Sequence, residues 1–414
     1  MATRVFHRYL VLILAVLAVV MLFRVERVQG FISGGVIVGR ISESETTQST
    51  SASTATTTSK CTHTILVVDP RVHSFLSLPS HNFWRALETF ALNGGDSGCF
   101  LVHTNAGECG DREDVKGSND EYVPGFIFDV PAEFYNSHEI KTYAPNLREC
   151  IVEGKFRVIN LDWRKYRLRD CSNYNPLKMW LSARYWAEEF VGDYSSNYVL
   201  TAQTDTVLCR PFELEVWKQW DFVGGAWPIE FCENHAKMWT NWNSNFKPTE
   251  EQAEADYDEF CGSDSFHPVG NGGLSFRQRN AMIEAIEFCP IESFSDLDDI
   301  HSVLQKSTCS IRAPRGGPNE DQYFAVLFKG MNKIRPHPLT ATIFASDLTN
   351  IEDVASQYEI SKDRTKEMMN AVGVGYDEEA EFQMPVGVHK LKRAREPRYI
   401  SAMRSHCPAV EYTF

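Results

Sequence analysis

Short apolar runs alternate with amphipathic segments from residue 62 onward, and this alternation predicts the fold. The runs predicted as strands are 63–71, 98–105, 155–163 and 197–208. The segments predicted as helices are 80–95, 172–190 and 279–289. Strands that alternate with helices indicate an α/β fold, in which helices flank a mostly parallel central sheet.

Polar residues follow the predicted strands at their carboxyl ends. Asp69 and Arg71 close the first strand, Asn105 closes the second, and Asp205 comes directly after "YVLTAQT". In sheets of this kind, ligands bind outside the carboxyl ends of the strands. A carboxylate at such a place needs hydrogen bonds, a cation or open water. Asp205 is therefore a candidate binding residue, and an ordinary turn or helix-cap residue is the alternative.

Three features mark the second half of the chain. Residues 229–267 carry an acidic run among Trp, Asn and Pro, which is typical of a long insertion or lid. A flexible glycine-rich run occupies 270–273, and a tight turn is its ordinary alternative. Two adjacent carboxylates, Glu320 and Asp321, lie at a loop-to-helix junction, where Asp321 is alternatively only an N-cap.

The N-terminus predicts attachment to a membrane. Residues 1–30 place two arginines before an uncharged apolar run at 9–23, which we interpret as a cytosolic tail and an uncleaved signal-anchor helix. A cleaved signal peptide is the alternative. Residues 31–60 form a Ser/Thr-rich stem that cannot build a core, and 61–414 is the globular domain. We therefore expect a single-pass type II protein of the Golgi or ER membrane, with this domain in the lumen.

Charge and cysteine content restrict the partners and the compartment. The formal net charge of −14 argues against nucleic acid as the main partner, and the basic run at 389–398 is local enough to be a solvated face. In an oxidising lumen, several of the eleven cysteines should form disulfides. No CxxC occurs, so neither a zinc ribbon nor a thioredoxin-type site is expected.

The absence of several motifs narrows the chemistry. The chain has no P-loop, no GxSxG, no HExxH and no GxGxxG that opens a helix, which argues against the common ATPases, serine hydrolases, metalloproteases and dinucleotide enzymes. A hard cation such as Mn²⁺ or Mg²⁺ fits what remains: the Asp205 carboxylate, oxygens of a diphosphate and the imidazole of His389. Lys390 would then face a phosphate. A surface histidine is the alternative for His389.

Several segments, taken in order, resemble a known family. They are "VVDPRVHSFL", "LTAQTDTVLC" with "WDFVGGAWP", "VGNGGLSFRQR", "NEDQYF" and "PVGVHK". Together they resemble a family of GT-A-fold glycosyltransferases that is classed as a domain of unknown function. The resemblance covers roughly 61–393 apart from 229–267. It implies a GT-A-like catalytic domain at 61–414 that moves a sugar from a nucleotide-sugar donor to a glycan or glycoprotein acceptor.

The resemblance also implies a role for each candidate residue. Gln203-Thr204-Asp205 stands where GT-A enzymes have DxD, so Asp205 and His389 would be the ligands of Mn²⁺ or Mg²⁺. Glu320 or Asp321 would be the acceptor-side carboxylate, which is a general base if the reaction inverts the anomeric centre. The residues expected at the donor are Asp69, Arg71, Gln203, Asn271, Gly272, Gly273 and Lys390.

Three functions are compatible with these observations. The first is a metal-dependent glycosyltransferase of the secretory pathway. The second is a non-catalytic carbohydrate- or nucleotide-binding protein of the same fold, which Gln203 in the DxD-like position favours. The third is a secreted, disulfide-stabilised interaction protein. We favour the first, because several weak motifs in the right order are hard to obtain by chance.

Overall fold

A computed structural model describes the globular part of the chain. The described residues are 61–68, 81–95, 97–104, 127–128, 130–161, 176–228, 269–289, 320–331, 333–347, 349–390 and 397–413. All of them belong to one compact unit, Thr58–Phe414. The predicted anchor at 1–30 and the stem up to residue 60 lie outside the described residues. Within the described ranges, no helix combines the length and apolar character that crossing a membrane requires.

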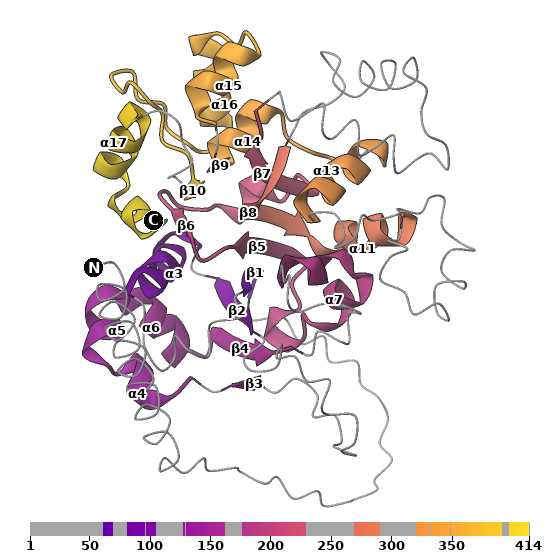
Figure 1. Cartoon of the computed structure of the whole chain (residues 1–414), viewed down its shortest axis with the longest axis vertical. Coiled ribbons are helices and arrows are strands. Elements are labelled where there is room, and N and C mark those ends of the chain that lie inside the picture. The colour runs from indigo at the N-terminus through magenta and orange to yellow at the C-terminus, as the bar shows by residue number, and fades with distance from the viewer. Residues whose placement is uncertain are drawn as a thin grey trace, which may run out of the picture. The chain divides into compact units, whose positions relative to one another are not determined.

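The main sheet has seven strands in the order β3-β4-β2-β1-β5-β8-β7 (Figure 1). Their bounds are β1 His63–Val68, β2 Gly98–Thr104, β3 Ile127–Phe128, β4 Phe156–Asn160, β5 Tyr198–Ala202, β7 Phe222–Ala226 and β8 Val269–Gln278. Four neighbouring strands, β4, β2, β1 and β5, are parallel, whereas β3 and β8 run antiparallel to their neighbours. The α/β class is therefore confirmed, with a mixed sheet whose parallel part is central.

Helices cover both faces of this sheet (Figure 1). On one face lie η3 Pro176–Leu181, α7 Ala183–Glu188, α11 Arg279–Phe288 and α13 Glu320–Gly330. On the other lie α3 His81–Asn93, α4 Ala132–Tyr135, α5 His138–Tyr143, α6 Pro145–Val152, α8 Leu214–Trp217, α14 Pro338–Phe344, α15 Ile351–Gln357 and α16 Lys362–Ala371. Alternate residues of β1 enter the two hydrophobic clusters, Ile65 on one face and Leu66 on the other. This burial on both faces is why the central strands are predominantly apolar.

A second, smaller sheet joins segments that are far apart in sequence. It has the order β6-β10-β9, with bounds β6 Thr206–Leu208, β9 Ala345–Ser346 and β10 Gly387–His389. His389 lies opposite Thr206 in the antiparallel pair β10–β6. Three short helices, η4 Gly192–Tyr194, α17 Pro397–His406 and η8 Pro408–Thr413, complete the described elements. The small sheet therefore brings the end of the domain back to the residues that follow β5.

Two predictions about local structure were wrong. Residues 270–273 lie in the first half of strand β8, where Asn271 pairs with Gly225 of β7, and form neither a flexible loop nor a tight turn. A register shift opposite Gly224 and Gly225 accommodates them. The predicted helix 172–190 is interrupted: its described part is η3 followed by α7, with Ser182 between them in an extended conformation.

Disulfides join segments that are distant in sequence, and the cysteine content predicted such bonds. Cys61 pairs with Cys99, which joins the segment before β1 to β2, and Cys209 pairs with Cys407. The second bond holds η8 and α17 against β6, across 198 residues of chain. Cys150, by contrast, is a free, partly buried thiol.

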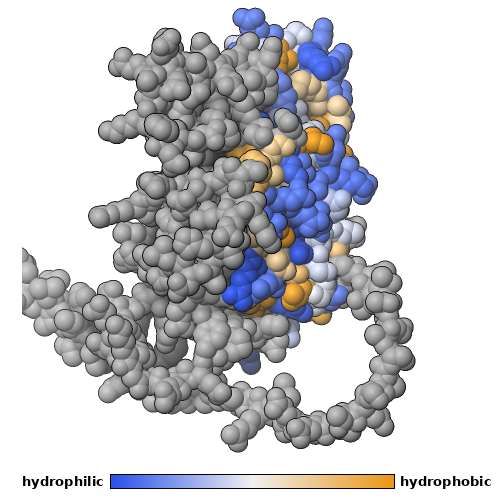
Figure 2. Space-filling view, turned by 90° about the vertical axis from the view of Figure 1, so that its right-hand side faces the viewer, coloured by the Kyte–Doolittle hydropathy of each residue, from blue (hydrophilic) through white to orange (hydrophobic). Residues whose placement is uncertain are grey.

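The face of the molecule in Figure 2 is polar where it is described. Hydrophilic residues predominate in the coloured surface, and hydrophobic ones are scattered among them. Scattered apolar residues are ordinary on a protein surface, whereas a functional apolar patch is contiguous. The coloured surface in this view therefore shows no contiguous apolar patch.

We predict that the Cys209–Cys407 bond stabilises the domain. Replacing both cysteines with Ser should lower the free energy of unfolding by about 2–5 kcal/mol, because the bond closes a long loop in the unfolded chain. Chemical denaturation of the purified protein measures this. Cys150→Ala is the control and should leave the midpoint almost unchanged. Equal midpoints for the double variant and the control would contradict the prediction.

Candidate functional site

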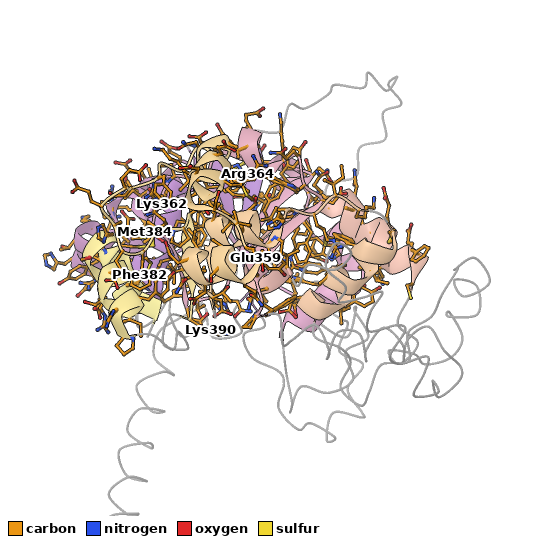
Figure 3. The ribbon with its side chains drawn as sticks, turned by 90° about the horizontal axis from the view of Figure 1, so that it is seen from above. Glu359, Lys362, Arg364, Phe382, Met384 and Lys390 are labelled. Atoms are coloured by element: carbon orange, nitrogen blue, oxygen red, sulfur yellow. A yellow bond between two sulfur atoms is a disulfide. The ribbon has the colours of Figure 1, made fainter. Side chains whose placement is uncertain are left out.

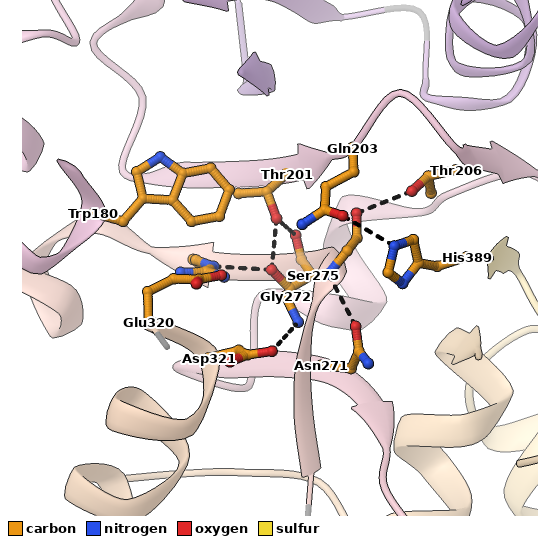
Figure 4. A network of polar contacts seen from close by, with 12 residues as sticks. Trp180, Thr201, Gln203, Thr206, Asn271, Gly272, Ser275, Glu320, Asp321 and His389 are labelled. Carbon is orange, nitrogen blue, oxygen red and sulfur yellow. Dashed lines mark hydrogen bonds and ion pairs between the residues drawn. The ribbon is translucent and has the colours of Figure 1, made fainter. Parts of the chain in front are cut away.

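The turn Gln203–Asp205 follows β5 at the edge where the parallel strands end. Val67 of β1 pairs with Ala202 of β5, so these two strands end side by side. Gly273 of β8 fixes the turn: its carbonyl accepts hydrogen bonds from Gln203 N at 2.9 Å and from Thr206 Oγ1 at 3.0 Å (Figure 4). Asp205 is thus held at the place where α/β sheets bind ligands.

His389 is the second member of this group. Its imidazole is buried, with 4 % of the residue exposed, and Nε2 lies 3.0 Å from Gln203 Oε1 (Figure 4). The same nitrogen lies 3.3 Å from Asp205 Oδ1. The ring packs directly on Gly273, where a Cβ atom would come within 2.1 Å of it. Only glycine therefore allows β8 to pass beneath the imidazole.

Lys390 reaches the same two side chains. Its Nζ donates a hydrogen bond to Gln203 Oε1 at 3.1 Å and lies 4.0 Å from Asp205 Oδ2. Its backbone N–H donates to the carbonyl of Asp205. The φ of Lys390 is 50°, a left-handed value that is costly for a residue with a side chain. Only Glu359 shares this feature among the described non-glycine residues, and Figure 3 labels both.

The charges of this group support one another. Burial acts to raise the pKa of Asp205, but the hydrogen bond from His389 and the charges of His389 and Lys390 outweigh it, so the pKa is lowered. Burial acts to lower the pKa of His389, but its interactions with the Asp205 and Asp347 carboxylates outweigh the effect of burial, so the pKa is raised. Asp205, whose side chain is 34 % exposed, is therefore an ionised carboxylate in contact with solvent.

Asp347, which the sequence analysis did not single out, lies on the other side of His389. It follows the two-residue strand β9 and is 4 % exposed. Its Oδ2 accepts a hydrogen bond from Asn271 Nδ2 at 2.5 Å and lies 3.6 Å from His389 Nδ1. Asn271 Oδ1 in turn accepts from Gly273 N at 3.0 Å. In the sequence, Asp347 follows the short apolar run 343–345. An aspartate after a short apolar run is too common to indicate a binding residue.

The two predicted acceptor-side carboxylates lie in different surroundings. Glu320 is 2 % exposed, and its Oε1 lies 3.6 Å from Arg277 Nη2, inside the fold. Asp321 is partly exposed, and its Oδ2 accepts a hydrogen bond from Gly272 N at 3.3 Å (Figure 4). Helix α13 begins at Glu320, so Asp321 lies in its first turn and is not its N-cap. Asp321 is the carboxylate that a bound molecule can reach.

The buried side chain of Arg277 lies beside Glu320. The Arg277 guanidinium is wholly buried, lies 4.3 Å from the ring centroid of Trp180, and donates from Nε to Ser275 Oγ. Burial, together with the charge of Asp321, raises the pKa of Glu320 to about 8, although Arg277 opposes this. Within the part of the chain that the structure describes, Glu320 Oε1 and both Nη atoms of Arg277 make no hydrogen bond.

The structure brings most of the predicted site residues together. Gln203, Asp205, His389 and Lys390 form one group, beside Asn271, Gly272 and Gly273 on β8, and Asp321 borders Gly272. The amide protons of Gly272 and Gly273 are already donated to Asp321 and Asn271. Asp69 and Arg71, as well as the predicted lid at 229–267, lie outside the described residues.

The donor atoms of the group suit a divalent cation. Asp205 Oδ1, His389 Nε2 and Gln203 Oε1 face one another, and carboxylate, imidazole and amide oxygen are ligand types that Mn²⁺ accepts. No cluster of three His, Cys, Asp or Glu side chains that could hold a metal occurs among the described residues. A cation here would displace the proton of Nε2 and would need further oxygens, which a diphosphate can supply.

The model of the family described as Protein of unknown function (DUF5672) matches residues 155–362, about half of the chain. Comparison with curated proteins gives no match.

Three solved structures are similar at low sequence identity, and their TM-scores are too low to support an argument about function. Galactosyltransferase LgtC in complex with donor and acceptor sugar analogues has 13 % identity and a TM-score of 0.41, over 84 % of this chain and 95 % of its own. Mouse xyloside xylosyltransferase 1 has 8 % identity and a TM-score of 0.38, over 81 % and 99 %. The bifunctional glycosyltransferase WbbM has 11 % identity and a TM-score of 0.33, over 80 % and 46 %.

We predict that Gly273→Ala destabilises the domain by about 1–3 kcal/mol, because the added methyl group would overlap the His389 ring. Gly375→Ala is a matched control: it has no atom within 4 Å of the added Cβ and no positive φ. Chemical denaturation compares the two variants. Equal stabilities would show that the imidazole has room to move away from β8.

The pH dependence of stability should depend on Glu320. Its carboxyl binds a proton more tightly in the folded chain, where the pKa is about 8, than at the ordinary value of 4.5. Stability from this group is therefore present at low pH and declines as the pH rises from about 4.5 to about 8. Glu320→Gln should lose less stability than the wild type between pH 5 and 8, in denaturation series at each pH. If the stabilities of the wild type and Glu320→Gln changed equally with pH, the raised pKa of Glu320 would be contradicted.

Proposed function

We propose, for a chain that belongs to the family Protein of unknown function (DUF5672), that it is a glycosyltransferase. It would move a sugar from a nucleotide-sugar donor to a glycan or glycoprotein acceptor. The observation that carries the proposal is the convergence of Gln203, Asp205, His389 and Lys390 at the carboxyl end of β5. A site with one exposed carboxylate, an imidazole and an ammonium group suits a cation and an anionic diphosphate together.

Each residue of the site would have a different role in such a reaction. Asp205 and His389 would hold Mn²⁺ or Mg²⁺, which when bound offsets negative charge on the departing nucleoside diphosphate. Lys390 is placed to contact a phosphate oxygen, because its Nζ lies at the edge of the same group. Gln203, in place of a first aspartate, would donate from its amide to the ribose once its present contacts are released.

The acceptor side of the reaction would lie toward α13. Asn271 and the glycines of β8 separate the Asp205 group from Asp321, so a sugar lying over this strand would contact both. Asp321 is partly exposed and would accept the proton of the acceptor hydroxyl if the reaction inverts the anomeric centre. Glu320 is buried against Arg277, so its role would be to hold the start of α13 in place.

We also propose that the domain works in the lumen of the Golgi or ER, attached through residues 1–30 as a type II membrane protein. The sequence of that segment and the Ser/Thr-rich stem support this arrangement. The bonds Cys61–Cys99 and Cys209–Cys407 support it further, because disulfides persist in oxidising compartments.

A non-catalytic binding protein of the same fold is the second candidate. A specific observation favours it: Gln203 supplies a neutral amide where a second carboxylate would strengthen cation binding, and its Oε1 already accepts hydrogen bonds from His389 and Lys390. Such a protein would bind a nucleotide or carbohydrate without turnover.

Binding of the donor tests the proposal. The melting temperature of the purified protein should rise with one nucleoside diphosphate or sugar nucleotide, and the rise should require Mn²⁺. A nucleotide at about 100 times its Kd stabilises the folded state by about 2.7 kcal/mol. Asp205→Asn should abolish the rise without unfolding the domain, because it removes the charged ligand of the cation.

The control variant is Glu215→Gln, which alters an exposed carboxylate paired with Lys218 on α8. It should shift as the wild type does. Release of nucleoside diphosphate from the donor that binds then separates an enzyme from a binding protein. The absence of any shift across the panel, from folded protein, would reject a nucleotide-sugar site.

A further inference from the structure

Asp347 occupies a position that its contacts alone do not explain. It is a carboxylate with 4 % exposure, and one of its oxygens, Oδ1, has no hydrogen-bond partner in the described part of the structure. A buried carboxylate with an unused oxygen is costly unless a nearby cation compensates for it. The nearby group that can carry this charge is His389, whose Nδ1 lies 3.6 Å from Asp347 Oδ2.

The imidazole of His389 lies between two carboxylates. Nε2 faces the exposed side, toward Asp205 and Gln203, and Nδ1 faces Asp347 in the interior. Nδ1 makes no hydrogen bond within 3.5 Å to a described residue, so Asp347 is its closest acidic neighbour. A histidine that binds a cation through one nitrogen commonly directs the N–H of the other to a carboxylate, which fixes the tautomer and the orientation of the ring.

Asp347 is itself held firmly. Asn271 donates to Oδ2, and the orientation of that amide is set in turn because Asn271 Oδ1 accepts from Gly273 N. Gly273 is also the residue on which the His389 ring packs. Gly273 therefore lies against the imidazole ring and Asp347, held by Asn271, faces Nδ1, while Nε2 faces Asp205.

We propose that Asp347 is a positioning residue for His389. Its Oδ2, 3.6 Å from Nδ1, favours the tautomer with the proton on Nδ1 and holds the ring so that the Nε2 lone pair is directed toward the cation that Asp205 shares. This inference rests on the proposed function in assigning His389 to a cation. Its structural part, the orientation of the ring by Asp347, is independent of any reaction.

The test is Mn²⁺ binding, measured by electron paramagnetic resonance on the full chain without nucleotide. Asp347→Asn and Asp347→Ala should raise the Kd for Mn²⁺ about 10–100-fold, the range typical of a lost orienting partner. His389→Ala should raise it at least as much. Glu352→Gln is the matched control, a carboxylate of α15 whose Oε1 accepts from Gln383 N, and it should change the Kd less than twofold.

Crystal structures of the wild type and Asp347→Ala provide the second measurement. The imidazole of His389 should leave its position facing Gln203 in the variant. An unchanged ring together with an unchanged Kd, while His389→Ala loses Mn²⁺, would overturn the inference and leave the proposed function intact. If the wild type takes up no Mn²⁺ without nucleotide, the ring orientation alone decides: a rotated ring supports the positioning role and an unchanged ring rejects it.

Discussion

The contact between the His389 imidazole and the Cα of Gly273 is the constraint on which the site depends. It joins the two sheets, because Gly273 belongs to β8 and His389 ends β10. The same glycine receives the Gln203 and Thr206 hydrogen bonds on its carbonyl and donates its N–H to Asn271. One residue without a side chain thus sets the distance between the turn after β5, the imidazole and the amide that holds Asp347.

A second buried charge pair lies on the other side of β8. Arg277 and Glu320 are both excluded from water, and burial favours the protonated form of Glu320, so a full ion pair with Arg277 forms only as the pH rises toward about 8. The pair fixes where α13 begins, and α13 carries Asp321. The acceptor-side carboxylate of the proposed reaction therefore depends on an ion pair that does not contact the substrate.

The sequence allowed the central strands and the order of the site residues to be predicted, because both follow from local patterns. Apolar runs located β1, β2, β4 and β5, the end of a strand selected Asp205, and the family resemblance gave Asp205 and His389 the role of metal ligands. Two features were not predicted from the sequence: the strand conformation of residues 270–273 and the place of Asp347 beside His389. Gly270, Gly272 and Gly273 looked flexible, because the side chains that leave no room for a Cβ atom there, those of Phe222, Glu320 and His389, come from other parts of the chain. Asp347 follows a strand of only two residues. Its proximity to His389 arises from tertiary packing, which the spacing of residues along the sequence does not predict.

Because of the small sheet, the site can form only late in the synthesis and folding of the chain. Its strands come from three remote parts of the chain, and 186 residues separate Gln203 from His389. During synthesis the N-terminal strands can pair early, but the imidazole and ammonium group emerge near the end of translation. Nascent or truncated chains therefore hold Asp205 without its partners, and cation affinity would appear only when folding of the whole domain is complete.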